Sequence, residues 1–401
     1  MFYENKKQET MEIAKLCKKL ENLSFQEMNL QNRSLALLAH SCPNLKSFAM
    51  EDCTNCHEGE VISLIKRCPT LESISMKRNM SLRGYWLKQL RQPLRRLSLN
   101  ACQFNPAHLI QGIINVKDSL KELNLTACYT IRCSDLDIIT GYLPGLVSLK
   151  LAGVFPDFKA HTLSHISKLK SLVKLNLERN LVVCDDFIQD LLDNCPNIST
   201  INLSCTDSSL LSQGGLCLVA KFPALTHLAL AYLSRLTDST LKTIAQEASN
   251  LRRLNLTGCT SVTDDGCTSV VSLCHSLEHL DISGCHSVTK ATVSSAIKSA
   301  KMGIKKTKLT IVIGESGVDL ESNWESPHVN IDRNSNCAQY GLESDEHLFF
   351  FDLMDNEVQF LNPGAYDVLN FYDVDALDFD EPFDYDVWSD DSNYSDESFE
   401  Y

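Results

Sequence analysis

Cysteine is the residue type with the most obvious chemical potential in this chain of 401 residues, which contains 17 of them. Cys53, Cys56 and His57 form a CxxCH motif, the spacing used for covalent haem attachment. No residue in a corresponding place supplies a distal axial ligand. A zinc site needs about four converging ligands, and a pair such as Cys128 with Cys133 supplies only half of one. We therefore predict no metal site, no haem and no other cofactor.

Paired acidic residues are the second group with chemical potential, and they occur at Asp185-Asp186 and Asp264-Asp265. Both pairs fall at the predicted starts of helices, where unpaired backbone amides favour negative charge. A threonine precedes the second pair, as expected for a helix cap. The chain also lacks a GxxxxGK phosphate loop, a GxSxG elbow, an HExxH helix and a kinase signature. We predict no catalytic residues and no enzymatic activity.

The cysteines follow an internal repeat, in which LxxLxL is followed three residues later by Cys or Asn. The period is about 26 residues, typical of a repeat architecture. The eleven units open at Leu20, Leu45, Leu71, Leu94, Leu120, Leu146, Leu172, Ile198, Leu225, Leu251 and Leu277. A final alternation of Leu309, Ile311 and Ile313 predicts one more strand that closes the array.

Each unit is predicted to be a strand, a turn and a helix, because its apolar period changes from two to about 3.6. Leu241, Ile244, Ala245 and Ala248, for example, define one apolar helix face. A single unit cannot bury both its strand and its helix, whereas stacked neighbours share a continuous core. We predict an α/β solenoid, curved like a horseshoe, with a parallel inner sheet and outer helices.

Two classes of cysteine occupy fixed places in the unit, and both are predicted to be packing residues. The first class lies eight residues after the opening Leu, where Asn79 and Asn180 stand in other copies. It comprises Cys53, Cys102, Cys128, Cys259 and Cys285. The second class lies three residues before the next opening Leu, at the end of the outer helix, and comprises Cys17, Cys42, Cys68, Cys195 and Cys274.

Charge divides the chain into parts. The formal net charge is -14, but residues 342–401 hold 19 Asp or Glu and no Lys or Arg, which leaves +5 for residues 1–341. We predict a polar leader (1–11), the solenoid (12–313), a linker (314–341) and a disordered acidic and aromatic tail (342–401). The mildly basic body has no dense Lys/Arg stripe, which argues against nucleic acid as the main ligand.

The sequence contains no apolar run that approaches 18 residues, so we predict no membrane span. Met1 to Glu12 lacks the basic region and apolar stretch of a secretory signal. We expect the protein in the cytoplasm, the nucleus or both, with its thiols reduced.

The repeat frame CPxLxxLxLxxC resembles the cysteine-containing subclass of leucine-rich repeats. It reads Cys42-Pro43-Asn44-Leu45 through Cys53, and it opens again at Cys195-Pro196-Asn197-Ile198. This subclass is typical of F-box/leucine-rich-repeat proteins, the substrate receptors of SCF-type ubiquitin ligases. The resemblance covers roughly residues 12–313. It implies a protein-binding module that recognises substrates for proteasomal degradation.

The sequence departs from that family at its N-terminal end. The family's F-box occupies helices before the repeats, yet Glu12 to Lys19 already aligns with the end of an outer helix. The Skp-type adaptor and the cullin are therefore implied partners only if a longer isoform carries an F-box. Two alternatives stay open. One is a scaffold or inhibitor without a role in degradation, and the other is a Ran-type GTPase-activating protein, whose units are longer and lack the regular cysteines.

Polar residues between the buried leucines are predicted to face solvent on the inner wall, because alternate side chains of a strand point to opposite faces. Arginine and lysine on this wall could pair with acidic or phosphorylated segments of a protein substrate. The candidate partner-binding residues there are Lys77, Arg96, Glu122, Lys150, Lys174, Glu178, His227, Arg253, His279 and Asp281.

Aromatic residues in two irregular units have two interpretations. Phe155 and Phe158 replace the usual polar turn, so they either anchor an interface or pack under the next helix, and we include them among the candidate partner-binding residues. Tyr85 and Trp86, in a shortened unit, are predicted to be core residues.

Overall fold

Each copy of the LxxLxL pattern forms one strand of a single parallel sheet, because its alternating leucines point to the same face. The computed structural model describes residues 19–30, 34–206, 209–303, 307–319, 324 and 326–337. Within them the sheet has thirteen strands that pair in sequence order. They are β1 (Asn22–Gln26), β2 (Ser47–Glu51), β3 (Ser73–Lys77), β4 (Arg96–Asn100), β5 (Glu122–Asn124), β6 (Ser148–Lys150), β7 (Lys174–Asn176), β8 (Thr200–Asn202), β9 (His227–Ala229), β10 (Arg253–Asn255), β11 (His279–Asp281), β12 (Leu309–Val312) and β13 (Val329–Asp332).

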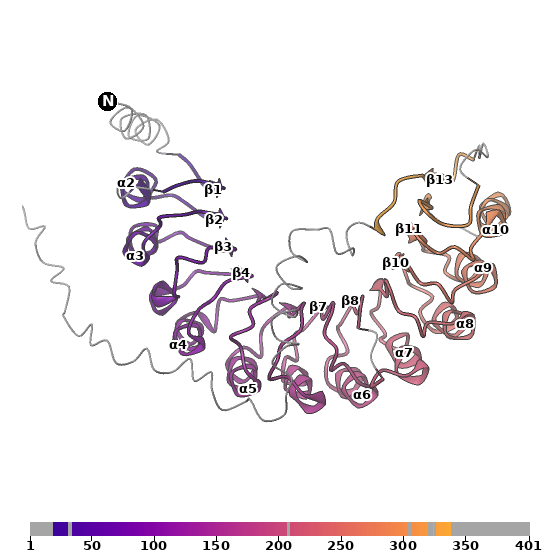
Figure 1. The fold of residues 1–401 in the computed structure, drawn as a ribbon, viewed down its shortest axis with the longest axis horizontal. Coiled ribbons are helices and arrows are strands. Elements are labelled where there is room, and N and C mark those ends of the chain that lie inside the picture. The colour runs from indigo at the N-terminus through magenta and orange to yellow at the C-terminus, as the bar shows by residue number, and fades with distance from the viewer. Residues whose placement is uncertain are drawn as a thin grey trace, which may run out of the picture. The chain divides into compact units, whose positions relative to one another are not determined.

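Outer helices follow the strands and lie on the convex side of the arc that the strands line (Figure 1). The predicted α/β leucine-rich-repeat solenoid, a horseshoe with a parallel inner sheet, is therefore confirmed. None of the helices in the described ranges is long and apolar enough to cross a bilayer. The helical segments are α2 (Ser34–Ser41), α3 (Glu58–Arg67), η1 (Tyr85–Gln89), α4 (Pro106–Val116), α5 (Cys133–Tyr142), η2 (Ala160–Lys168), α6 (Asp185–Asn194), α7 (Gln213–Val219), α8 (Asp238–Glu247), α9 (Asp264–Leu273) and α10 (Lys290–Lys301).

Two predictions about the ends of the chain lie outside the described residues. The polar leader with Cys17 precedes residue 19, and the acidic tail follows residue 337. The chain divides into one unit from Met1 to Tyr340 and a second from Gly341 to Tyr401. The solenoid belongs to the first unit.

The cysteine or asparagine after each strand is buried and donates to a backbone carbonyl of the preceding unit. Cys259 Sγ lies 3.1 Å from the Leu230 carbonyl oxygen, and Cys285 Sγ lies 3.0 Å from that of Leu256. Asn79 Nδ2 donates to the Met50 carbonyl at 2.8 Å. The predicted burial of these residues is confirmed, and each one satisfies a carbonyl that the sheet leaves unpaired.

The residue before this cysteine or asparagine turns the chain outward with a positive φ. The non-glycine residues at this position have φ between 49° and 61°. We call this position the left-handed turn. It is occupied by Glu27, Asp52, Arg78, Ala101, Ala127, Arg179, Cys205 and Tyr232, and by glycine at Gly153, Gly258 and Gly284.

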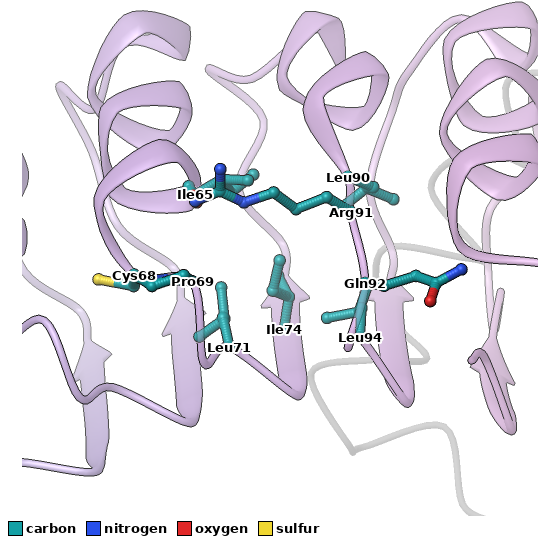
Figure 2. A pocket seen from close by; sticks show the side chains of 9 residues that line it. All are labelled: Ile65, Cys68, Pro69, Leu71, Ile74, Leu90, Arg91, Gln92 and Leu94. Carbon is teal, nitrogen blue, oxygen red and sulfur yellow. The ribbon is translucent and has the colours of Figure 1, made fainter.

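Two units contain a 3-10 segment where an α-helix was predicted. The unit that opens at Leu71 is short, and its outer segment is η1, a helix of five residues. Figure 2 shows Arg91, which follows η1, extending toward Ile65. Its guanidinium donates to the carbonyls of Ile65 and Lys66 at the end of α3. The gap left beside it is about 10 Å³, too small to hold more than about one water molecule, so this is a packing defect.

The aromatic residues of the irregular units correct two expectations. Phe155 and Phe158 are only 4% and 5% exposed and stack on each other at 4.6 Å between ring centroids. They are core residues, and the interpretation of these two as partner-binding anchors is wrong. Trp86 is buried as predicted, whereas Tyr85 is 54% exposed. Its ring packs against His108 at 4.5 Å on the outer surface, because the short η1 cannot cover it.

The sheet continues past the strand that was predicted to close it. β13 pairs with β12 in parallel register, within the residues predicted to be a linker. Residues 333–337, which we call the return segment, then fold back toward earlier units. Asn336 Nδ2 donates to Asp281 at 2.5 Å, and Tyr232 Oη donates to the Cys337 carbonyl at 3.4 Å.

Glycine is required where the return segment and Tyr232 approach the left-handed turns. A Cβ on Gly284 would lie 2.7 Å from Cys337 Sγ, and a Cβ on Gly258 would lie 2.6 Å from the Tyr232 ring. Both distances are well below van der Waals contact. The two glycines therefore allow the end of the chain to lie close over the ends of β10 and β11.

Candidate functional site

The strand register aligns the predicted inner-wall residues in columns across the sheet. Each residue of the first column is the direct neighbour of the next on the adjacent strand. This first column runs Arg96, Glu122, Ser148, Lys174, Thr200, His227, Arg253 and His279. The second column, two residues later, runs Ser98, Asn124, Lys150, Asn176, Asn202, Ala229, Asn255 and Asp281.

The second column has a structural task that the sequence analysis missed. Its Asn and Asp side chains accept a hydrogen bond from the backbone amide two residues later, at 2.8 to 3.0 Å. These are Asx turns, which end the strands. The accepting residues are Asn124, Asn176, Asn202, Asn255 and Asp281.

Several candidate residues lie apart from the rest or have partners. Lys77 forms an ion pair with Glu51 at 3.0 Å. Glu178, which follows β7, accepts from Asn202 at 3.1 Å. Lys150 is exposed on β6, and Arg96 and Glu122 lie on β4 and β5. The structure does not bring these residues together with the candidates on β9 to β11.

Five candidates do lie close together: Lys174, His227, Arg253, His279 and Asp281 are on β7 to β11. All of these except Lys174 line a hollow of about 290 Å³ on the inner face, which we call the β8–β11 hollow. Ala229 explains it, because this residue occupies a position where both neighbouring strands have an asparagine. The lining consists of Thr200, Ile201, Asn202, His227, Leu228, Ala229, Arg253, Leu254, Asn255, His279, Asp281 and Asn336.

Burial and nearby positive charge keep the two histidines of the hollow neutral. Burial lowers the pKa of His227, and Arg253, Arg252 and Lys174 lower it further, against a smaller opposing effect of Glu278. Burial also lowers the pKa of His279; Asp281 and Asp332 oppose this shift, and Arg253 adds to it. Both imidazoles are therefore hydrogen-bonding groups at neutral pH, beside a permanent cation.

The carboxylate in the hollow is already satisfied. Asp281 is 2% exposed and accepts from the Ser283 amide at 3.0 Å and its hydroxyl at 2.7 Å. Its second oxygen accepts from Asn336 of the return segment. The return segment thus closes one edge of the hollow, and the positive Arg253 side chain faces solvent.

The CxxCH residues have the environment of packing residues. Cys53 and Cys56 are 3% and 1% exposed, and burial raises the pKa of the Cys56 thiol to about 12. This thiol is protonated at neutral pH, whereas a metal ligand is a thiolate. Within the described ranges, no three His, Cys, Asp or Glu side chains are grouped so that they could hold a metal ion.

The paired acids connect neighbouring units on the outer side. The first acid of each pair accepts from the residue that begins the next unit's helix, so capping occurs between units. Asp185 accepts from the Ser212 amide at 2.8 Å, and Asp264 accepts from the Thr289 amide at 3.0 Å. Thr263 also caps its own helix as predicted, accepting from the Asp265 amide at 3.2 Å.

Comparison with known proteins shows a shared fold across large sequence distances. No protein-family model matches the chain. The RNA-binding protein EEED8.10 of Caenorhabditis elegans is 24% identical over 252 residues, which is 62% of this chain and 34% of that protein. The chain thus spans about a third of that relative's length.

Solved structures show the same architecture. A chain of the yeast Rad7 and Elc1 complex has a TM-score of 0.62 at 15% identity, over 80% of this chain and 82% of that one. The TLR13–ssRNA13 complex gives 0.50 at 14% identity, over 79% and 53%. The leucine-rich-repeat protein LegL7 of Legionella pneumophila gives 0.44 at 11% identity, over 84% and 98%.

Proposed function

We propose that this leucine-rich-repeat solenoid is a protein-binding module that recognises a protein target on its inner face and performs no chemistry itself. The observation that carries the proposal is the cluster of exposed cations and neutral histidines on β7 to β11, around the β8–β11 hollow. Side chains of this kind, on a rigid concave sheet, suit recognition of a protein surface. The similar yeast solenoid was solved in complex with Elc1, which supports binding of protein partners by this architecture.

We further propose that the target is a substrate of an SCF-type ubiquitin ligase. This rests on the resemblance of the repeat frame to F-box/leucine-rich-repeat proteins, whose characteristic cysteines here occupy the buried positions after the strands. The module would contribute proximity, because holding a target beside a conjugating enzyme raises the effective concentration of its lysines. Seventeen cysteines without a disulfide among the described ones suit a reducing compartment such as the cytoplasm or nucleus.

Affinity purification of the full-length gene product tests both parts of the proposal. The double variant Lys174→Glu/Arg253→Glu reverses charge on the inner face. Lys117→Glu/Lys221→Glu, after the outer helices α4 and α7, is the matched control. We expect the inner-face variant alone to lose the target, and the wild type to recover the Skp-type adaptor and a cullin.

The outcomes separate the alternatives. Recovery of the target without adaptor or cullin would favour a scaffold or inhibitor that has no role in degradation. Equal recovery of the target by both double variants would contradict recognition on the inner face.

RNA is the second candidate ligand, because EEED8.10 is named as an RNA-binding protein and TLR13 was solved with ssRNA13. The inner face favours a protein target. Proteins that bind single strands generally combine a continuous basic groove with stacking aromatic residues, whereas Glu122 interrupts the first column here. Anisotropy with a labelled single-stranded RNA at two salt concentrations decides the matter. Tight, salt-dependent binding that Lys174→Glu/Arg253→Glu abolishes would favour RNA.

A further inference from the structure

We propose that the β8–β11 hollow binds one phosphorylated serine or threonine of the protein target, with Arg253 as its main charge partner and His227 and His279 beside it. This inference rests on the proposed function and adds the chemistry of the recognised group. Its evidence is the position of three side chains, the state of the neighbouring carboxylates, and the shape of the hollow.

The three side chains are placed to meet at one anion. His227, Arg253 and His279 are register neighbours on β9, β10 and β11. Adjacent strands lie about 4.8 Å apart, so a group seated over Arg253 is within reach of both imidazoles. A guanidinium forms two parallel hydrogen bonds to a phosphate, which makes arginine the favoured residue for this recognition.

Arg253 is available for such a ligand. In the described part of the chain, no carboxylate forms an ion pair with its guanidinium, although carboxylates are near. Glu278 pairs with Arg252 at 3.4 Å, and Asp281 is held by Ser283 and Asn336. Elsewhere on this face the cations are engaged, as Lys77 is with Glu51. The centre of the hollow is therefore positive.

The number of donors favours a phosphate over a carboxylate. A phosphoserine carries a charge of about -1.5 to -2 and three acceptor oxygens. The hollow offers the guanidinium, two imidazoles and the polar groups of Thr200 and Asn202 on its other side. A carboxylate has two oxygens and one charge, so it would leave part of this set unused.

A phosphorylated protein segment also fits better than an RNA backbone. RNA places a phosphate at every nucleotide and needs a row of cations, but the first column has Thr200 and Ser148 on either side of Lys174, and Glu122 beyond. One isolated dianion satisfies the hollow. The missing side chain at Ala229 provides the room for it.

Proton uptake should accompany binding. Burial and Arg253 lower the pKa of His227, with Arg252, Lys174 and Glu278 as its other charged neighbours. His279 is shifted in the same direction and faces Asp281, Arg253 and Asp332. A bound dianion favours the imidazolium forms, so affinity should rise as pH falls from 8 to about 6.5. Below about pH 6 the phosphate itself becomes protonated, and the gain should end.

The test uses the full chain and three peptide libraries that share degenerate flanks. The central residue is phosphoserine or phosphothreonine in the first library, serine or threonine in the second, and glutamate in the third. We expect at least tenfold enrichment from the first library. A peptide selected from it then gives affinities by fluorescence anisotropy.

Variants locate the site. Arg253→Gln should weaken the selected peptide at least tenfold, and Ala229→Asn, which fills the hollow, should do the same. Arg95→Gln is the matched control, because Arg95 is an exposed arginine that precedes β4. It should bind within twofold of the wild type. The double variant His227→Gln/His279→Gln should retain binding at pH 8 and lose the gain at pH 6.5.

Three results would overturn the inference: equal enrichment from the phosphorylated and unphosphorylated libraries, wild-type affinity in Arg253→Gln, or displacement of the peptide by single-stranded RNA at lower concentration than by phosphoserine peptides. Thermal unfolding of each variant checks that it is folded. If the libraries show no phosphate preference while Lys174→Glu/Arg253→Glu still loses the target in cells, protein recognition stands and only the phosphate specificity fails.

Discussion

Single side chains connect each unit to the next, and Asp264 shows this most fully. Its carboxylate accepts four hydrogen bonds, from the amides and hydroxyls of Thr289 and Thr292, at 2.6 to 3.0 Å. These bonds satisfy two amides in the first turn of α10. Asp265, beside it, forms only an exposed ion pair with Lys242.

Asp264→Asn should therefore destabilise the protein, and Asp265→Asn should be nearly neutral. We expect the free energy of unfolding at pH 7 to fall by about 1–3 kcal/mol for the first variant and by less than about 1 kcal/mol for the second. Urea denaturation followed by circular dichroism measures both. Equal effects of the two variants would contradict the role of Asp264.

The pH dependence of this difference has a definite sign. Burial raises the pKa of Asp264, but the hydrogen bonds from Thr289 and Thr292 outweigh it, so the pKa is lowered overall. A carboxyl whose pKa is lower when folded stabilises the protein above its unfolded pKa of about 3.9. The advantage of the wild type over Asp264→Asn should persist to about pH 5 and then shrink as pH falls through the folded pKa.

At this scale the sequence predicts positions better than partners. The period indicated that Cys259 and Cys285 are interior, and both are 0% exposed. It did not indicate that Asn124 or Asn202 would end strands, because an asparagine on a strand face looks the same whether it binds a partner or its own backbone. The β8–β11 hollow was missed as well, although the loss of asparagine at Ala229 is visible once the columns are aligned.

The repeated element has a strained point at the left-handed turn. Most residues there carry a Cβ, as Ala127 does at φ 54°. A non-glycine residue in this conformation costs about 1–2 kcal/mol. The column persists because each turn directs the chain from a strand to the outer side of the sheet.

Ala127→Gly should stabilise the protein by up to about 1 kcal/mol, because relief of the turn exceeds the added entropy of glycine in the unfolded chain, about 0.5–1 kcal/mol. The Ala127 amide, which donates to Ala152 at 2.9 Å, is kept. Ala107→Gly in α4 is the control and should destabilise, since that position is helical. Chemical denaturation compares the midpoints. Destabilisation by both variants would show that the turn carries no strain.

Elements were predictable where the period is regular. The eleven strand openings rest on paired leucines in every copy. η1 was not predictable, because a unit shortened to 23 residues keeps its apolar residues but lacks the length for an α-helix. β13 has only Val329 and Ile331 in alternation, too short a signal to separate it from a linker.

The whole solenoid is a one-dimensional stack in which units contact mainly their neighbours. Every strand pair joins consecutive strands, from β1 to β13. The return segment is an exception, since Tyr232 and Cys337 are 105 residues apart and lie in contact. This contact fastens the last strands to β9 and should make the C-terminal units unfold together.

Leucine to alanine substitutions in the middle and at the start of the array should distinguish local from global unfolding. Leu254 is 0% exposed on β10, between β9 and β11, so Leu254→Ala should lower the free energy of unfolding by about 2–5 kcal/mol. Leu23, on β1, is only partly buried and pairs with β2 alone among the described strands, so Leu23→Ala should cost less than about 1 kcal/mol.

Hydrogen exchange read by mass spectrometry then shows how far each defect spreads. In Leu254→Ala, amides of β9 to β13 should exchange faster together, because the return segment joins them, while β4 to β6 keep their protection. In Leu23→Ala, faster exchange should stay within β1 and β2. A uniform increase over all strands in Leu254→Ala would mean that the stack unfolds as one cooperative unit, and a change confined to β10 would mean that the return segment transmits nothing.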